Sequence, residues 1–471
     1  MSRLLDAEVL AARTLGQVVR RAGRGGGTSL PGRALIRLDP RAIAKLAGRL
    51  PHGSAVISAT NGKTTTAAMA AAILDGAGER LVHNRAGANM AGGVASALLA
   101  AARPGGIDGG LGLFELDELW LDRVVPQLRP RALSLGNLFR DQLDRYGELE
   151  TIADRWAAMV AGLAADVRVA CNADDPLIAD LGRRHPGTCW FGVEDPAMAA
   201  TDMQHASDSK HCRNCGAAYE YDAVYLGHLG VYHCPACWQR RPEPEVAARA
   251  VELLGTRGAR FELHSPAGVA AVELPLPGLY NVYNALAAAA LCLSLGVELD
   301  AVVRGLSAVS AAFGRAQRVT IGARELSILL VKNPAGANEV ARTLALEDGE
   351  LDLLAVLNDN TADGRDISWI WDADLELLAD RVRRITCAGT RAAELALRFK
   401  YAGVSPTRLH VVPELPAALD AAVASRPEQA ERAQPLFVLP TYTALLELQR
   451  ELARRGHVDQ YWSRAPSAVS A

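Results

Sequence analysis

The stretch from Ser54 to Leu74, SAVISATNGKTTTAAMAAAIL, has the residue types of a phosphate-binding loop. A short β-branched apolar segment enters a turn with Gly62 and Lys63, and an Ala-rich segment without Pro follows as a predicted helix. In a P-loop, backbone N–H groups hold phosphate oxygens, a lysine neutralises them and a threonine hydroxyl reaches magnesium. Lys63 and Thr64 fill these two positions, although Ile57 replaces the first glycine of the full motif. The alternative is a chance Gly-Lys-Thr on a solvated turn.

A second chemical signal is the segment GLGLFELDE, an apolar predicted strand that ends in Glu115, Asp117 and Glu118. A carboxylate at the end of a strand beside a P-loop can bind magnesium. Acids at strand ends are also commonly only solvated. This segment therefore supports the P-loop interpretation and would be weak alone.

Four cysteines have the spacing Cys-x2-Cys-x18-Cys-x2-Cys, which is typical of a zinc ribbon. They are Cys212, Cys215, Cys234 and Cys237. The alternatives are two disulfides, which a reducing cytoplasm disfavours, or a redox pair. Four thiolates leave zinc no open coordination position, so we expect a structural metal. The residues between the two pairs alternate like a short hairpin, with His228 and His233 expected at the surface.

A third cluster is NDNTADGRDISWIWD, residues 358–372, where four aspartates follow the apolar run LLAVL and no Cys or His lies among them. Asp359 and Asp363 could simply form turns. Asp366 could cap the segment that follows, because aspartate is a favoured N-cap.

Several motifs resemble the Mur ligase superfamily of ATP-dependent ligases. In chain order they are TNGKTTT, GNLFRDQLDRYGELE, CNADDP, LPGLYNVYNALAAAA and FGRAQR. Within that superfamily, the four-cysteine ribbon, NRAGANMAGGVASA, LVKNPAGANEV, the aspartate-rich segment and LPTYTALLEL closely resemble the MurT family. Members of this family are synthetase subunits of lipid II isoglutaminyl synthase. The resemblance covers nearly the whole chain.

The sequence departs from the wider superfamily at a few positions. Ala59 replaces a glycine, and Gln142, Tyr146 and Tyr280 replace histidines. The acidic residue that many relatives have before NPAG is missing. These departures concern the second magnesium site and the usual ribose contact, and not phosphate binding.

The resemblance implies a reaction in which ATP phosphorylates a carboxylate and ammonia attacks the resulting acyl phosphate. The carboxylate is the α-carboxylate of D-isoglutamate in the lipid II stem peptide, and the product is D-isoglutamine. The implied catalytic residues are Lys63 for the β and γ phosphates, Glu115, and Asp366. Thr64 and Glu115 would hold magnesium. The implied ATP-binding residues are Thr60, Asn61, Gly62, Lys63, Thr64, Thr65, Asn281, Asn284 and Arg315.

The source of ammonia must lie outside this chain, because no cysteine lies in a Gly-x-Cys-x-Gly elbow of the kind a glutaminase needs. The MurT family works as a heterodimer with a glutaminase subunit, GatD, which carries the Cys and His. The resemblance implies that this chain lends the third member of that triad. We expect it to be Asp366, with Asp363 as the second candidate, because Gly364 lets the loop turn tightly.

The helices and strands that would position these sites can also be predicted from the sequence. The 471 residues predict about three domains in an α/β protein. We expect a helical lead-in over 1–50, a central ATP-binding domain with a parallel sheet over 51–316, a Rossmann-like C-terminal domain over 317–465, and a flexible tail over 466–471. The zinc ribbon is expected as an insertion over 205–242.

The net charge of −3 gives no basic footprint for nucleic acid or for anionic lipid. The N-terminal segment indicates an amphipathic helix and not a signal peptide, and the longest apolar run is shorter than the about 20 residues that span a bilayer. We therefore expect a cytoplasmic protein. The resemblance to the MurT family, whose substrate is lipid II, implies that it acts at the inner face of the membrane. The rival hypotheses are a Mur-type ligase for a free amino acid, such as a folylpolyglutamate or cyanophycin synthetase, and a nucleic-acid-binding ATPase that reads with its ribbon.

Overall fold

The larger sheet is built from short apolar segments in which nearly every residue is buried. β1 (Ser54–Ser58), β5 (Leu111–Glu115) and β6 (Ala132–Leu135) are buried along their whole length. Strands of this kind need cover on both faces of the sheet, which is typical of a parallel sheet between two layers of helices. The computed structural model describes residues 2–21, 29–84, 88–140, 149–200, 207–309, 315–424 and 435–458.

This sheet has nine strands in the order β13-β12-β11-β8-β7-β6-β1-β5-β2 within the described residues. The run from β11 to β2 is parallel, and β12 and β13 extend it as antiparallel strands. The other strands are β2 (Leu81–His83), β7 (Arg168–Asn172), β8 (Thr188–Val193), β11 (Val246–Leu253), β12 (Ala259–Ser265) and β13 (Gly268–Leu274). Two small two-stranded sheets are separate: β3 (Ala102–Arg103) with β4 (Gly106–Ile107), and β9 (Glu220–Leu226) with β10 (Leu229–His233).

The two faces of the sheet bury two different cores. Ala55 and Ile57 of β1 belong to one hydrophobic cluster and Val56 to the other, as the alternation of side chains along a strand requires. The first face is covered by α4 (Lys63–Gly76), α10 (Leu279–Ser294) and α11 (Leu299–Ala308). The second is covered by α1 (Ser2–Arg21), α2 (Leu30–Leu38), α3 (Ala42–Ala47), α5 (Ala91–Ala101), α6 (Leu121–Leu128), α8 (Leu149–Ala161) and α9 (Pro176–Gly182). We call this assembly the P-loop unit.

A smaller α/β layer structure follows, which we call the C-terminal unit. Among the residues that the structure describes there, its six strands have the order β14-β15-β19-β16-β17-β18, all parallel except β14. The strands are β14 (Arg315–Ile321), β15 (Arg324–Leu329), β16 (Leu351–Val356), β17 (Val382–Ala388), β18 (Leu409–Val411) and β19 (Leu436–Pro440). Its helices are α12 (Pro334–Ala345), α13 (Ala392–Tyr401), α14 (Leu415–Ala424) and α15 (Tyr442–Arg454). The expected α/β fold class, with a parallel-sheet unit and a smaller Rossmann-like unit, is confirmed.

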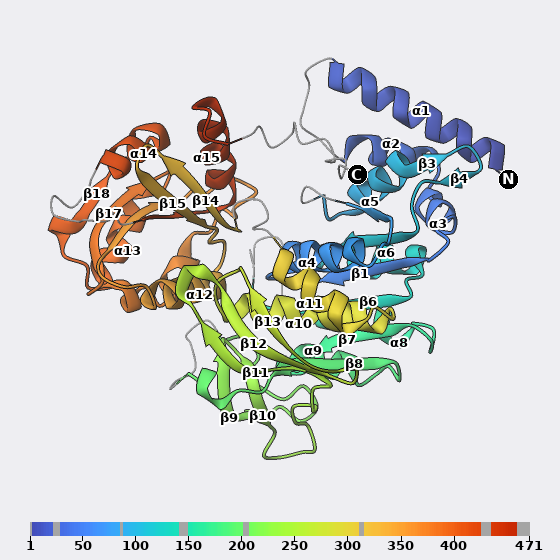
Figure 1. Cartoon of the computed structure of the whole chain (residues 1–471), viewed down its shortest axis with the longest axis horizontal. Helices are drawn as coiled ribbons and strands as arrows, with labels where there is room; N and C mark the ends of the chain where they lie inside the picture. The colour runs from blue at the N-terminus through green and yellow to red at the C-terminus, as the bar shows by residue number, and fades with distance from the viewer. Residues whose placement is uncertain are drawn as a thin grey trace.

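Short 3-10 turns connect these elements: η1 (Pro196–Met198), η2 (Gly255–Arg257), η3 (Ser368–Asp372), η4 (Leu375–Leu378) and η5 (Pro406–Arg408). Figure 1 shows α12 where the two units meet. There Arg342 Nη1 donates to the carbonyl of Tyr225 at 2.8 Å, and the Thr256 N–H donates to Glu347 Oε1 at 2.6 Å. Within the described ranges, no helix is both long enough and apolar enough to cross a membrane.

Candidate active site

The P-loop turns at Gly62, which lies between β1 and α4 with a φ of 86°. A Cβ atom at this position would lie 1.9 Å from Asn284 Oδ1. Only glycine fits both this backbone conformation and the close approach of α10. The sequence thus brings the first turn of α4 and the start of α10 against the same loop.

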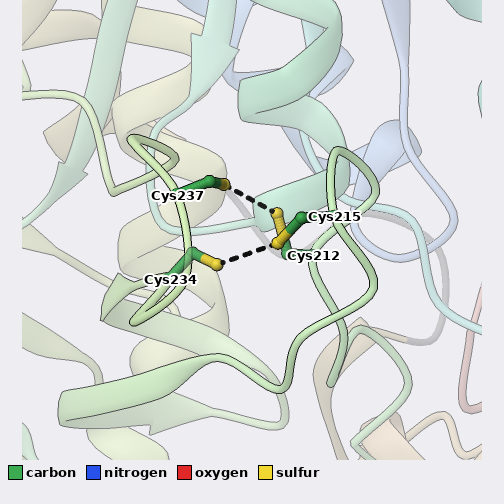
Figure 2. Close-up of side chains that lie close together, drawn as sticks. All are labelled: Cys212, Cys215, Cys234 and Cys237. Atoms are coloured by element: carbon green, nitrogen blue, oxygen red, sulfur yellow. Dashed lines mark hydrogen bonds between the residues drawn. The ribbon is translucent and has the colours of Figure 1, made fainter.

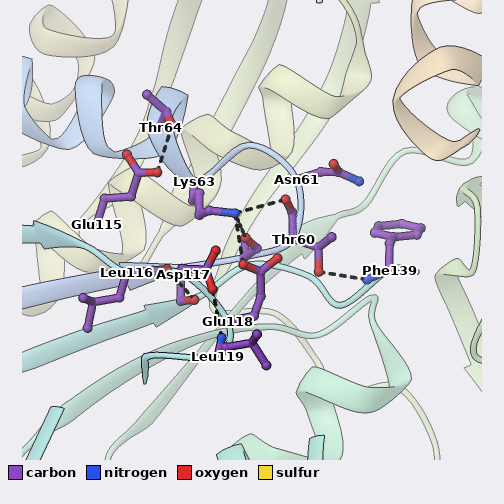
Figure 3. A network of polar contacts seen from close by, with 12 residues as sticks. Thr60, Asn61, Lys63, Thr64, Glu115, Leu116, Asp117, Glu118, Leu119 and Phe139 are labelled. Carbon is purple, nitrogen blue, oxygen red and sulfur yellow. Dashed lines mark hydrogen bonds and ion pairs between the residues drawn. The ribbon is translucent and has the colours of Figure 1, made fainter. Parts of the chain in front are cut away.

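Lys63 is held inside the loop. Its Nζ donates to the Ala59 carbonyl and to Glu118 Oε2, both at 3.1 Å (Figure 3). Both side chains of this ion pair are almost fully buried. Burial alone would raise the pKa of Glu118, but the positive charges of Lys63 and Lys332 outweigh it, so that this pKa lies below its usual value. The pair is therefore ionised at neutral pH.

Thr64 meets a carboxylate from the neighbouring strand. Its Oγ1 donates to Glu115 Oε1 at 2.9 Å (Figure 3), and Glu115 pairs with Ile57 in the register of β1 and β5. A hydroxyl and a carboxylate side by side at a P-loop are hard oxygen donors of the kind that magnesium prefers. The donor set thus fits a magnesium ion.

Asparagines fix the rest of the loop. Asn137 Oδ1 accepts from the Asn61 N–H at 2.9 Å, and Asn137 Nδ2 donates to the Asn61 carbonyl at 3.0 Å. On the α10 side, Asn284 Nδ2 donates to Asn281 Oδ1 at 3.0 Å, and Thr66 Oγ1 donates to Asn284 Oδ1 at 3.3 Å. Asn281 and Asn284 thus lie beside the P-loop.

A cavity of about 910 Å³ opens where the two units meet, and we call it the junction cavity. The C-terminal unit contributes Lys332 and Glu339 to its wall. Lys332 Nζ donates to the Thr60 carbonyl at 3.1 Å, and Asn333 Nδ2 donates to Asn61 Oδ1 at 2.9 Å. Its lining residues from the P-loop unit are Asn61, Gly62, Thr65, Asn137, Phe139, Leu226, Leu229, Leu276, Tyr280, Asn281, Tyr283 and Asn284. The lining therefore combines polar groups of the P-loop, α10 and the C-terminal unit with apolar side chains.

Some expected features lie outside the described residues. Arg315 is the first residue of β14, but its side chain is not among those described. Gln142 and Tyr146 fall in 141–148, and the expected tail over 466–471 also lies outside the described residues.

The four cysteines come together at the end of the β9–β10 hairpin (Figure 2). All four Sγ atoms lie within 4.8 Å of one another, with Cys215 and Cys234 3.4 Å apart and Cys212 and Cys237 3.6 Å apart. Sulfurs at the corners of a tetrahedron are about 3.8 Å apart when each lies about 2.3 Å from a central ion. The cluster therefore fits a metal ion bound by four thiolates.

His228 was expected at the surface, and this expectation was wrong. Its side chain is fully buried, its ring centroid lies 4.5 Å from that of Phe139, and its Nε2 lies 3.4 Å from Asp175 Oδ2. The ring is buried because the tight turn at Gly227, which has a φ of 59°, packs against Phe139. Nothing in the alternating pattern of the hairpin reveals the direction of that turn.

The aspartate segment is part of the C-terminal unit. Asp363 is buried, and its two oxygens accept from the N–H and the hydroxyl of Thr443 in the first turn of α15. Burial raises the pKa of Asp363 above its usual value. Asp366 is exposed, and its Oδ1 accepts from the Ser368 N–H at 2.8 Å, which lowers its pKa. Asp359 pairs with Arg391 at 2.8 Å.

Comparison with known proteins relates this geometry to a family. A model of the Mur ligase middle domain matches residues 57–233, and a model of the MurT ligase C-terminal domain matches residues 330–445. The lipid II isoglutaminyl synthase (glutamine-hydrolyzing) subunit MurT of Streptococcus pneumoniae is 31% identical over 95% of this chain and 96% of its own length. The chain belongs to the MurT family. The MurT subunit of Staphylococcus aureus (strain N315) is 32% identical over 83% of this chain and 87% of its own length.

The fold of this MurT-family chain extends to more distant proteins. A pseudomurein peptide ligase type C from Methanothermus fervidus superposes with a TM-score of 0.64 at 19% identity, over 96% of this chain and 97% of that one. This likeness concerns the fold alone.

Three polar residues of the site received no role from the sequence. The sequence placed Glu118 among three acids at the end of a strand. Its contact with Lys63 depends on the path of the chain after β5, which the sequence does not reveal. Asn137 and Lys332 lie far from the P-loop in sequence and reach it only through the fold. The family motif LVKNPAGANEV contains Lys332 and was the one available signal for it.

Proposed function

We propose that this chain is the synthetase subunit of a lipid II isoglutaminyl synthase. It would use ATP to convert the α-carboxylate of D-isoglutamate in the lipid II stem peptide to the amide of D-isoglutamine, at the inner face of the cytoplasmic membrane. The observation that carries the proposal is the likeness to two MurT subunits over 95% and 83% of the chain, together with a cavity that both the P-loop and Lys332 of the C-terminal unit line. The names of these relatives give lipid II, the isoglutaminyl product and glutamine hydrolysis, and the family resemblance implies the other details of the reaction.

The reaction requires charge neutralisation and positioning more than covalent chemistry by the protein. Transfer of the γ-phosphoryl group to the carboxylate gives an acyl phosphate and ADP. Ammonia then attacks the acyl carbon, phosphate leaves, and the amide remains. Lys63 and Lys332 approach the loop from the two units, and we assign them to the phosphates. Lys63 would exchange its contact with Glu118 for the nucleotide.

The cofactors are assigned from the donor atoms present. Thr64 and Glu115 would hold magnesium, which would neutralise negative charge on the phosphates. Asn281 and Asn284 would line the nucleotide site, and Arg315 would steady the phosphates. Zinc is the metal that best suits the four-thiolate cluster, where it would be structural.

The ammonia would come from a partner glutaminase, GatD, in a heterodimer. We assign Asp366 as the residue lent to the partner, because it is exposed, whereas Asp363 is buried against Thr443. An ionised carboxylate is needed to orient a histidine, and the lowered pKa of Asp366 keeps it ionised.

The test is mass spectrometry of lipid II incubated with the purified chain, ATP and magnesium, using ammonium or glutamine as the nitrogen source, with and without the glutaminase. We expect Asp366→Asn to lose amidation from glutamine and to keep amidation from ammonium. The matched control is Asp372→Asn, an exposed aspartate of the same segment, which should keep both.

Equal loss of both nitrogen sources in Asp366→Asn would contradict its role toward the partner. If wild type amidated no lipid II from either source but consumed ATP with a free amino acid, the alternative ligase function would replace the proposal.

A further inference from the structure

The hairpin that carries the cysteine cluster also reaches the junction cavity at its other end. Leu226, the last residue of β9, and Leu229, the first of β10, both line the cavity. Both side chains are buried, at 5% and 1% exposure. The apolar part of the cavity lining thus includes the hairpin turn together with Phe139 and Tyr280.

The turn is linked to the P-loop through Phe139. A Cβ atom at Gly227 would lie 2.7 Å from Phe139 Cε1, and the His228 ring packs on the same phenyl ring. The Phe139 N–H in turn donates to Thr60 Oγ1 at 3.1 Å. Displacement of the turn would therefore move both a wall of the cavity and a residue that contacts the loop.

The turn is also linked to the cysteine cluster and to α12. Tyr221 Oη donates to the His228 carbonyl at 2.9 Å, and the Tyr221 and Tyr232 rings lie 5.9 Å apart within the hairpin. Cys234 directly follows β10 and donates its N–H to the Gln239 carbonyl at 2.7 Å. The link to α12 is the hydrogen bond from Arg342 to the carbonyl of Tyr225, the residue before Leu226 in β9.

We propose that the β9–β10 turn is the wall that receives the apolar faces of the nucleotide base, and that the cysteine cluster positions this wall. The proposal rests on the proposed use of the junction cavity by a nucleotide. The thiol geometry fits a metal ion, and a bound ion would join the two ends of the chain segment that contains the hairpin. A residue of this turn is a positioning or base-contacting residue and takes no part in phosphoryl transfer.

The first test measures the dissociation constant of ADP with magnesium by calorimetry, using Gly227→Ala and the control Gly322→Ala. Both glycines lie in hairpin turns with almost equal φ, 59° and 61°, so the backbone cost of alanine is matched. Gly322 has no neighbour within 4 Å, whereas Gly227 faces Phe139. We expect about fivefold to thirtyfold weaker binding in Gly227→Ala, the size of one lost aliphatic contact, and no change in the control.

The second test removes the metal from the full chain with a chelator and restores it with zinc. We expect ADP binding to weaken on removal and to recover on restoration, while circular dichroism shows that the two sheets persist. If Gly227→Ala does not fold, metal removal alone tests whether the cysteine cluster and the β9–β10 turn affect ADP binding.

ADP binding by wild type separates failure of this inference from failure of the proposed nucleotide site. If wild type binds ADP and neither the variant nor metal removal changes its affinity, the role of the turn is overturned while the proposed function stands. If zinc-loaded wild type binds no ADP at all, the nucleotide assignment of the cavity falls, and this inference falls with it.

Discussion

The lysine of the P-loop is held in place by a buried carboxylate. Lys63 and Glu118 form a buried ion pair, and the lowered pKa of Glu118 reflects the two lysines near it. A buried charge without a partner is costly, so removal of one member of such a pair destabilises the fold strongly. A nucleotide would supply the missing negative charge. Glu118 and a nucleotide phosphate would therefore compete for Lys63.

We expect Glu118→Gln to lower the free energy of unfolding by about 3 kcal/mol and to bind ADP more tightly than wild type, since Lys63 no longer has to leave a carboxylate. Denaturant unfolding and calorimetry measure the two effects. The control is Glu273→Gln, whose side chain is 78% exposed beside Arg260 and should change neither quantity appreciably. Weaker ADP binding in Glu118→Gln would instead give Glu118 a direct role with the nucleotide or its magnesium.

The same pair predicts a pH dependence. Because the folded pKa of Glu118 is lowered, its ionisation stabilises the fold above the ordinary glutamate pKa of about 4.3, and this stabilisation is lost as pH falls through the folded pKa. We expect the stability difference between wild type and Glu118→Gln to be full at neutral pH and to shrink below about pH 4. A difference that grows on acidification would contradict the ionised pair.

The predictions for single residues succeeded where the residues of a site lie close together in the sequence. Gly62, Lys63 and Thr64 are neighbours, so their shared loop could be predicted from the sequence. The partners of Lys63 and Asn61 could not, since Glu118 and Asn137 reach them only through the parallel register of β1, β5 and β6. The same limit explains His228, whose burial depends on the packing of a turn against Phe139.

At the scale of the elements, the aspartate segment contains one buried aspartate that contacts a helix, Asp363, and one exposed aspartate, Asp366. The segment leaves β16, and Asp363 caps the first turn of α15, which follows β19. The sequence suggested turn and capping roles for these aspartates, but the helix that Asp363 caps lies 80 residues further along the chain. Parallel pairing of β16 and β19 brings the two together.

We expect Asp363→Ala to lower the free energy of unfolding by about 1 to 2 kcal/mol, because two donors at the start of α15 lose their acceptor. Asp366→Ala should change it by less than about 0.5 kcal/mol, because the side chain is exposed. Urea unfolding of both variants measures this difference. Equal destabilisation by the two substitutions would contradict the distinction between a structural and an exposed aspartate.

At the scale of the whole molecule, the candidate active site contains residues of both units. The P-loop comes from one unit and Lys332 from the other, and the α/β character of each unit could be predicted from alternating apolar segments and helices. Their contact at α12 could not, because it depends on single pairs such as Arg342 with Tyr225.

We expect Lys332→Met to weaken binding of ADP with magnesium by about tenfold, since a positive charge at the phosphate end of the cavity is lost. The matched control is Lys400→Met, an exposed lysine at the end of α13, which should bind as wild type does. Calorimetry at two salt concentrations measures the affinity for ADP in each variant. An unchanged affinity in Lys332→Met would contradict a role of this lysine in phosphate binding.

The strand order of the C-terminal sheet sets the order of events during synthesis on the ribosome. β19 lies between β15 and β16, so neither of these strands has its partner on that side until residue 440 has left the exit tunnel. The nine-stranded sheet is complete once residue 274 has emerged. The P-loop unit is therefore free to fold first, while the nascent C-terminal unit still has open strand edges that can pair with other chains.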